Sequence, residues 1–70
     1  MKYVYIIKTS ECGIHSVYTS KRKCGEALYR LCGEYDYPMS IDEESQFHAK
    51  SYICLDTDGG TITAEQFEVE

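Results

Sequence analysis

One stretch of the chain repeats its apolar residues with the period of an α-helix. Between Ser20 and Tyr35 the apolar residues recur at offsets 0, 3, 4, 7, 8 and 11, while charged residues fall on the opposite side. Ser20 can cap the first turn, and the helix must end before Pro38 because the residue preceding a proline leaves the α region. The pattern therefore predicts one amphipathic helix over residues 20–35. Its apolar stripe consists of Cys24, Ala27, Leu28, Leu31, Cys32 and Tyr35.

Strand-like segments flank this helix on both sides. Residues 2–8 and 14–19 are rich in β-branched and aromatic side chains, and the turn-forming stretch between them predicts a hairpin. Residues 47–55 and 61–69 predict a second hairpin around the Asp- and Gly-rich turn at 56–60. Ser40 and Glu43 match a capping box, which allows one short helical turn at about 41–46. We expect a single compact α+β domain over residues 1–70, with the order ββαββ, a four-stranded, mainly antiparallel sheet and one helix packed on one face.

Four tyrosines are candidates for a binding surface on the face of the sheet that the helix leaves open. If Val4 and Ile6 face the helix, the tyrosines at alternate positions of the same strand face the other way. Tyrosine is enriched at interfaces because it combines apolar area with a hydrogen-bonding tip. A half-exposed sheet that needs no partner explains the same pattern, and a dimer through this face is a further alternative. The candidate residues are Tyr3, Tyr5, Tyr18 and Tyr52.

The two parts of the chain carry opposite charge. Residues 1–30 have six basic side chains against two acids, whereas residues 31–70 have ten acids against one lysine, and the whole chain has a net charge of −5. Such an acidic second half predicts a basic protein or ribonucleoprotein as the partner and argues against direct binding of nucleic acid. A solvated loop is the simpler explanation for the acids between the helix and the second hairpin. The candidate contacts there are Asp36, Asp42, Glu43 and Glu44.

A basic cluster opens the predicted helix. Lys21, Arg22 and Lys23 lie at its N-terminus, where the helix macrodipole disfavours cations. These side chains either extend into solvent or form a local contact for a phosphate or an acidic patch.

The cysteines and histidines form no recognisable reactive motif. Cys24 and Cys32 lie on the apolar stripe and are expected in the core. A small metal or redox module using Cys12, His15, His48 and Cys54 remains an alternative, but the ligands lack the tight pairs of zinc sites. We therefore expect no catalytic residue, no bound metal and no cofactor. The N-terminal apolar run is too short for a signal or membrane segment, which favours a cytoplasmic protein with free thiols.

The short chain, the ββαββ order opened by residues 1–8, the lack of a catalytic signature and the acidic second half resemble small phage-encoded anti-defence proteins, anti-CRISPR proteins among them. The resemblance concerns general architecture and transfers no functional residue. It implies a non-enzymatic inhibitor in the host cytoplasm that occludes a nucleic-acid-binding or subunit surface of a host defence complex. The alternatives are the metal or redox module and an accessory subunit that forms a homodimer.

Overall fold

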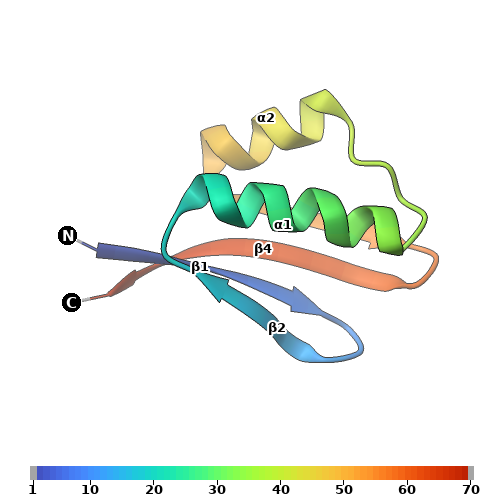
Figure 1. Ribbon diagram of the computed structural model, residues 1–70, viewed down its shortest axis with the longest axis horizontal. Coiled ribbons are helices and arrows are strands. Elements are labelled where there is room, and N and C mark those ends of the chain that lie inside the picture. Colours follow the sequence, from blue (N-terminus) through green and yellow to red (C-terminus); the bar gives the residue numbers. More distant parts are fainter. Residues whose placement is uncertain (1, 70) are drawn as a thin grey trace.

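A four-stranded antiparallel sheet carries two helices on one face in the computed structural model, which describes residues 2–69 (Figure 1). The strand order across the sheet is β2-β1-β4-β3, so the first and last strands pair at its centre. The α+β class and the antiparallel sheet are confirmed, but a second helix gives the order ββααββ. The elements are β1 (Lys2–Thr9), β2 (Gly13–Tyr18), α1 (Lys21–Glu34), α2 (Ile41–Lys50), β3 (Tyr52–Thr57) and β4 (Gly60–Val69).

Both predicted hairpins form, and their turns lie at the same end of the sheet. β1 and β2 pair around the turn at residues 10–12, while β3 and β4 pair with Thr57 opposite Gly60. Gly60 has a φ of 132°, a conformation that only glycine adopts without strain. Ser10 N donates to Thr61 O at 3.0 Å, and Ser10 Oγ accepts from Thr61 N at 3.1 Å. These bonds hold the first turn against the start of β4.

The predicted amphipathic helix is confirmed as α1. The Ser20 hydroxyl accepts from Lys23 N at 3.4 Å and so satisfies one of the free N–H groups of the first turn. At the other end, Tyr35 N lies 3.1 Å from Cys32 O and 3.2 Å from Leu31 O. The expected apolar stripe packs against the sheet, with Cys24, Leu28, Leu31 and Cys32 buried.

The second helix replaces the start of the predicted third strand. The Ser40–Glu43 capping box is present, with Glu43 N donating to Ser40 Oγ at 3.1 Å and Ser40 N donating to Glu43 Oε1 at 3.0 Å. Three acids in the first turn and a lysine in the last turn complement the macrodipole. Phe47 is fully buried, so the helix gains burial by continuing beyond its first turn. The strand prediction for residues 47–50 is therefore wrong.

Left-handed geometry at Ser51 ends α2 and allows β3 to begin at Tyr52. Ser51 has a φ of 58°, and its N–H donates to Phe47 O at 2.7 Å. Gln66 N in turn donates to Ser51 O at 3.0 Å, which fixes the helix end to β4.

The helices cover the face of the sheet that carries Tyr5 and Ile7, a choice that the sequence had left open. Tyr5 and Ile7 are buried under the helices, whereas Val4 and Ile6 lie on the open face. Alternation determines which residues share a face but not which face is covered, and β1 is apolar on both sides. The condition under which the tyrosines would gather on the open face, Val4 and Ile6 facing the helix, is therefore not met. Tyr3 and Tyr5 are on the helix side, Tyr18 pairs with Tyr5 and packs against the core, and Tyr52 alone of the four lies on the open face.

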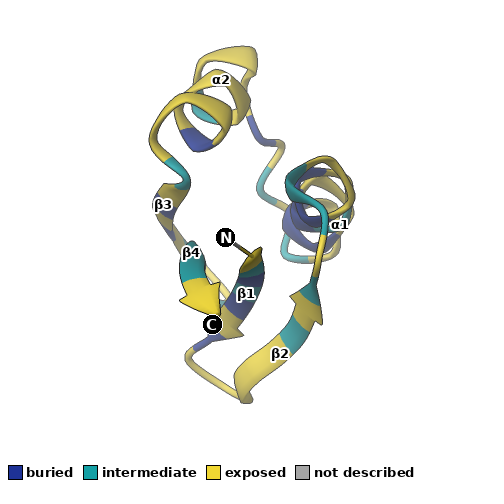
Figure 2. Cartoon of the chain, turned by 90° about the vertical axis from the view of Figure 1, so that its left-hand side faces the viewer, coloured by how far each residue is buried: buried dark blue, intermediate teal, exposed yellow. Residues whose placement is uncertain are grey.

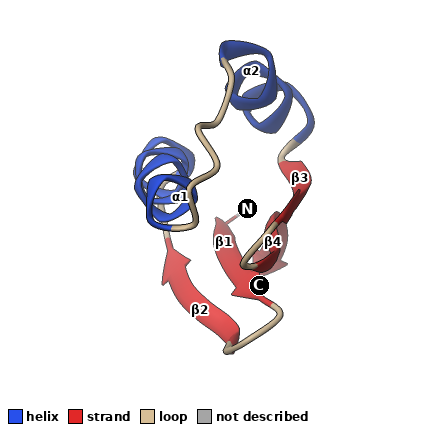
Figure 3. Cartoon of the chain, turned by 90° about the vertical axis from the view of Figure 1, so that its right-hand side faces the viewer, coloured by secondary structure: helices blue, strands red, loops and turns tan. Residues whose placement is uncertain are grey.

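The core lies between the sheet and the helices, and the opposite face carries no helix (Figures 2 and 3). No helix within residues 2–69 is long and apolar enough to cross a membrane. The buried apolar residues are Tyr5, Ile7, Cys24, Leu28, Leu31, Cys32, Met39, Phe47, Ile53, Leu55, Ile62 and Ala64.

Candidate partner-binding surface

Four acids from three separate segments meet at one end of the molecule. Glu11 comes from the β1–β2 turn, Glu34 and Asp36 from the end of α1, and Asp58 from the β3–β4 turn. All four are exposed, and together with Tyr35 and Gly59 they line a hollow of about 450 Å³. Figure 1 shows that α1 finishes where the two hairpin turns lie, at the end of the sheet opposite the start of β1 and the end of β4. We call these four residues the acidic end.

Backbone geometry at the end of α1 sets the position of these acids. Asp36 adopts a left-handed φ of 55°, and its N–H donates to Gly33 O at 3.2 Å. Tyr37 N donates to Cys32 O at 2.8 Å and closes the turn by which the chain reverses after α1. A Cβ on Gly59 would lie 2.9 Å from Tyr35 Cδ2, so glycine allows the β3–β4 turn to approach this ring closely.

The charges of α1 oppose its macrodipole at both ends. The first turn carries Lys21, Arg22 and Lys23, where the helix N-terminus is already positive, while Glu34 and Asp36 lie at the negative C-terminus. α2 has the favourable arrangement, with acids in its first turn and Lys50 in its last. Each unfavourable charge costs some tenths of a kcal/mol at low salt. At the acidic end, the helix dipole and the carboxylates therefore add to one negative potential.

The predicted acids between α1 and β3 separate into two groups. Asp36 belongs to the acidic end, whereas Asp42, Glu43 and Glu44 form the first turn of α2. Asp42 and Glu44 are exposed. Glu43 is engaged within the fold, because Tyr37 Oη donates to its Oε2 at 2.6 Å in addition to the capping bonds from Ser40. A role of these three acids in partner binding stays a prediction.

The basic cluster is partly used to join the two helices. Lys21 Nζ donates to His48 O at 3.2 Å, near the end of α2, and Arg22 Nε pairs with Glu26 Oε1 at 3.4 Å along α1. Both Arg22 and Lys23 are exposed. The cluster lies at the opposite end of α1 from the acidic end, so the molecule is electrically polarised along this helix.

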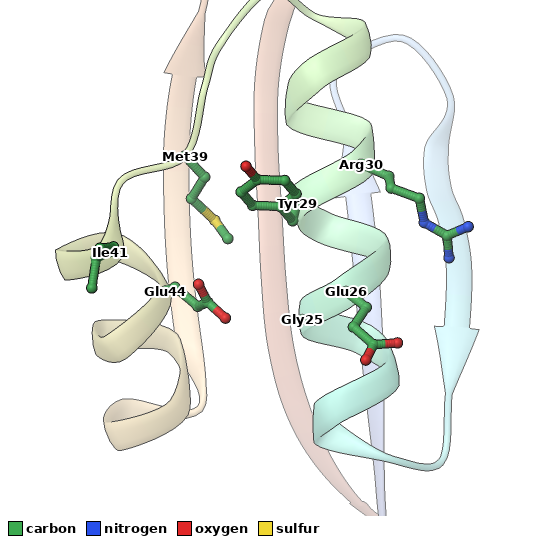
Figure 4. A pocket seen from close by; sticks show the side chains of 7 residues that line it. All are labelled: Gly25, Glu26, Tyr29, Arg30, Met39, Ile41 and Glu44. Atoms are coloured by element: carbon green, nitrogen blue, oxygen red, sulfur yellow. The ribbon is translucent and has the colours of Figure 1, made fainter.

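A groove between the helices has a volume of about 730 Å³. Figure 4 shows Tyr29 of α1 and Met39 of the connecting segment pointing toward one another across it. Tyr29 and Ile41 are exposed, and Met39 is buried at the floor. Gly25 allows the close approach of α2, because a Cβ there would lie 3.3 Å from His48 Nε2. The remaining lining residues are Glu26, Arg30 and Glu44.

The sequence could not reveal this groove, because one of its walls is α2. The two apolar residues on either side of Ser40, Met39 and Ile41, were a weak signal for it.

The cysteines divide into two buried and two exposed thiols. Cys24 and Cys32 are fully buried, as predicted, and burial raises the pKa of each to about 11, with the Glu43 charge as a second cause at Cys32. Cys12 lies in the β1–β2 turn and Cys54 on the open face of β3, both exposed. Among the described residues, no three His, Cys, Asp or Glu side chains are close enough to hold a metal ion. The residues of the metal alternative are thus not gathered at one site in the described part of the chain, and the redox alternative stays a prediction.

The comparisons with known proteins supply no relative for this chain: no family model, curated protein or solved structure matches it.

Proposed function

We propose that this chain is a small non-enzymatic binding protein that inhibits a larger protein by covering a basic, nucleic-acid-binding surface with its acidic end. The resemblance to phage-encoded anti-defence proteins supplies the target class, a host defence complex such as a CRISPR effector. In this proposal the chain acts stoichiometrically in the host cytoplasm, and it binds protein rather than nucleic acid.

The charge distribution along α1 carries the proposal. Glu34 and Asp36 lower the stability of the helix that they end, and Glu11 and Asp58 bring two more negative charges beside them. An arrangement that costs stability without serving the core is typical of functional surfaces. Four carboxylates that project from three separate segments around one hollow match several separated cationic side chains of a partner. Arginine suits such carboxylates through bidentate hydrogen bonds.

The groove between the helices offers the same partner an apolar anchor. Between the groove and the acidic end, Gly33, Asp36, Tyr37 and Pro38 line a smaller hollow of about 290 Å³, and Asp36 borders both this hollow and the acidic end. A partner segment with basic residues at one end and an aliphatic or aromatic side chain at the other would contact both regions. Such an apolar anchor in a pocket commonly contributes most of the affinity of an interface.

Two charge variants test the proposal. The acidic-end variant carries Glu34→Gln, Asp36→Asn and Asp58→Asn, and Asn is suitable at position 36 because it tolerates a positive φ. The matched variant removes three charges that line neither the acidic end nor the groove, by Asp56→Asn, Glu65→Gln and Glu68→Gln. Circular dichroism first establishes that both variants retain the fold.

Each immobilised protein is then exposed to a bacterial lysate that contains the defence complexes, and the retained proteins are quantified by mass spectrometry. We expect the wild type and the matched variant to retain a nucleic-acid-binding protein that the acidic-end variant loses. Salt and added nucleic acid should release it, because both compete for the same cationic surface. Equimolar wild-type chain should also block nucleic-acid binding by the purified partner in a gel-shift assay. Retention of the same proteins by all three baits, or a partner that still binds nucleic acid when saturated with the chain, contradicts the proposal.

A further inference from the structure

The face of the sheet away from the helices carries a continuous apolar patch. Cross-strand pairing places Ile6 beside Val17 and Val4 beside Phe67, so the patch crosses β2, β1 and β4. Ile14 and Val17 are 61% and 54% exposed, which is unusual for aliphatic residues in the strands of a small monomer. We define the open-face patch as Val4, Ile6, Ile14, Val17, Phe67 and Val69.

Charge on this face is balanced, unlike the charge of the whole chain. Alternation along the strands places Lys2 and Lys8 of β1 and Asp56 and Glu65 of β3 and β4 on the same side as the patch. Two cations and two carboxylates make the face neutral, whereas the chain has a net charge of −5. Two copies of an acidic protein repel one another through most of their surface, but this neutral face permits them to approach. It is also self-complementary, since lysines of one copy can meet carboxylates of the other.

The area of the face is sufficient for a specific interface. Four strands of six to ten residues, spaced by about 4.8 Å and with about 3.3 Å per residue, give a face of about 20 by 25 Å. The projected area of two such faces is about 1,000 Å², and the relief of the side chains increases the accessible area that they bury. This reaches the lower end of specific protein interfaces.

We propose that the open-face patch is the interface of a two-fold homodimer. Two sheets pack face to face about 10 Å apart in a sandwich, and the patch residues form a second core between them. Lys8 Nζ, which lies 5.4 Å from the centre of the Phe67 ring in the single chain, can then reach a carboxylate of the second copy. The helices and the groove lie on the other side of the sheet, so both copies keep them exposed. This inference does not depend on the proposed inhibitory function.

The oligomeric state of the full chain tests the dimer. Light scattering and sedimentation velocity over a dilution series should show a dimer that dissociates on dilution. Val17→Asp should give a monomer, and Val17→Thr, which retains the β-branched shape, should raise the dissociation constant about tenfold or more because each substitution acts twice in a two-fold interface. The matched control is Ile41→Asp, on α2 and 82% exposed, which should remain dimeric. A wild type that is monomeric at every concentration, or equal dissociation of the Ile41 and Val17 variants, overturns the proposal.

A second measurement needs no substitution. Cys54 lies on the open face and Cys12 in the β1–β2 turn, and both thiols are exposed in the single chain. Dimerisation covers Cys54 and leaves Cys12 accessible. The alkylation rate of Cys54 relative to Cys12 should therefore fall as the protein concentration rises, whereas a constant ratio contradicts the interface.

Discussion

The Tyr37 hydroxyl donates a hydrogen bond of 2.6 Å to Glu43 Oε2 and so ties the segment after α1 to the first turn of α2. The same carboxylate accepts the Ser40 backbone N–H at 3.0 Å. The backbone bond from Ser40 is the largest cause that lowers the pKa of Glu43, followed by the bond from Tyr37, and the carboxylate raises the pKa of Tyr37. The start of α2 therefore depends on an ionised Glu43.

This dependence predicts a pH-sensitive contribution to stability. Folding lowers the pKa of Glu43, so the ionised carboxylate stabilises the folded state. This stabilisation is fully present above the unfolded pKa of about 4.3 and is lost as the pH falls through the folded pKa. We expect Glu43→Gln to lower the urea midpoint at neutral pH and to have less effect at about pH 3. Glu44→Gln, in the same helical turn, serves as the control, since Glu44 is exposed and its side chain takes no part in the capping box. A loss of stability for Glu43→Gln that is the same at both pH values would contradict this account.

We expect alanine substitutions at the two glycines of α1 to change the stability of the protein by different amounts. A Cβ on Gly33 meets no atom within 4 Å, so Gly33→Ala should stabilise the protein by about 0.5–1 kcal/mol through the higher helix propensity of alanine. At Gly25 the added Cβ would lie 3.3 Å from His48 Nε2, so the same change must displace this ring and should gain less. Urea unfolding of both variants measures the difference. An equal gain at both positions would show that α2 does not pack closely on Gly25.

We expect the two exposed thiols to react with alkylating reagents and the two buried thiols to be protected from them. Cys24 and Cys32 are fully buried and have a pKa of about 11, so very little thiolate is available at neutral pH. In dilute solution, iodoacetamide should modify Cys12 and Cys54 in the native chain and all four cysteines in denaturant, as intact-mass measurements would show. Modification of Cys24 or Cys32 at the rate of Cys12 would place these side chains outside the core.

The sequence predicted α1 and not the full α2 because the two helices bury different numbers of side chains. α1 repeats several apolar residues at helical spacing, whereas α2 buries Phe47 alone among its ten residues and therefore has no apolar period. Its capping box was visible, but the β-branched and aromatic residues that follow it extended the predicted strand too far toward the N-terminus. Both faces of β1 are apolar, so alternation alone could not decide which one the helices cover.

The candidate site was predicted only in part. The acidic character of the second half was visible in the sequence, but Glu11 lies in the basic half and joins Asp58 through the pairing of distant strands. A clustering that depends on topology leaves no local signal in the chain. The opposition between the charges and the dipole at the start of α1 was visible, whereas the corresponding opposition at its end became clear once the helix boundary was known.

The opposition between the charges of α1 and its macrodipole predicts that the Glu34 carboxylate lowers the stability of the fold. Glu34 lies at the negative end of α1 and Asp42 at the positive end of α2, and both are exposed. We expect Glu34→Gln to stabilise the protein by about 0.3–1 kcal/mol at low salt and Asp42→Asn to destabilise it by a similar amount, with both effects reduced at high salt. Urea unfolding at two salt concentrations measures these changes. If Glu34→Gln destabilised the fold instead, Glu34 would be a structural residue, and the argument that the acidic end is maintained for binding would lose its basis.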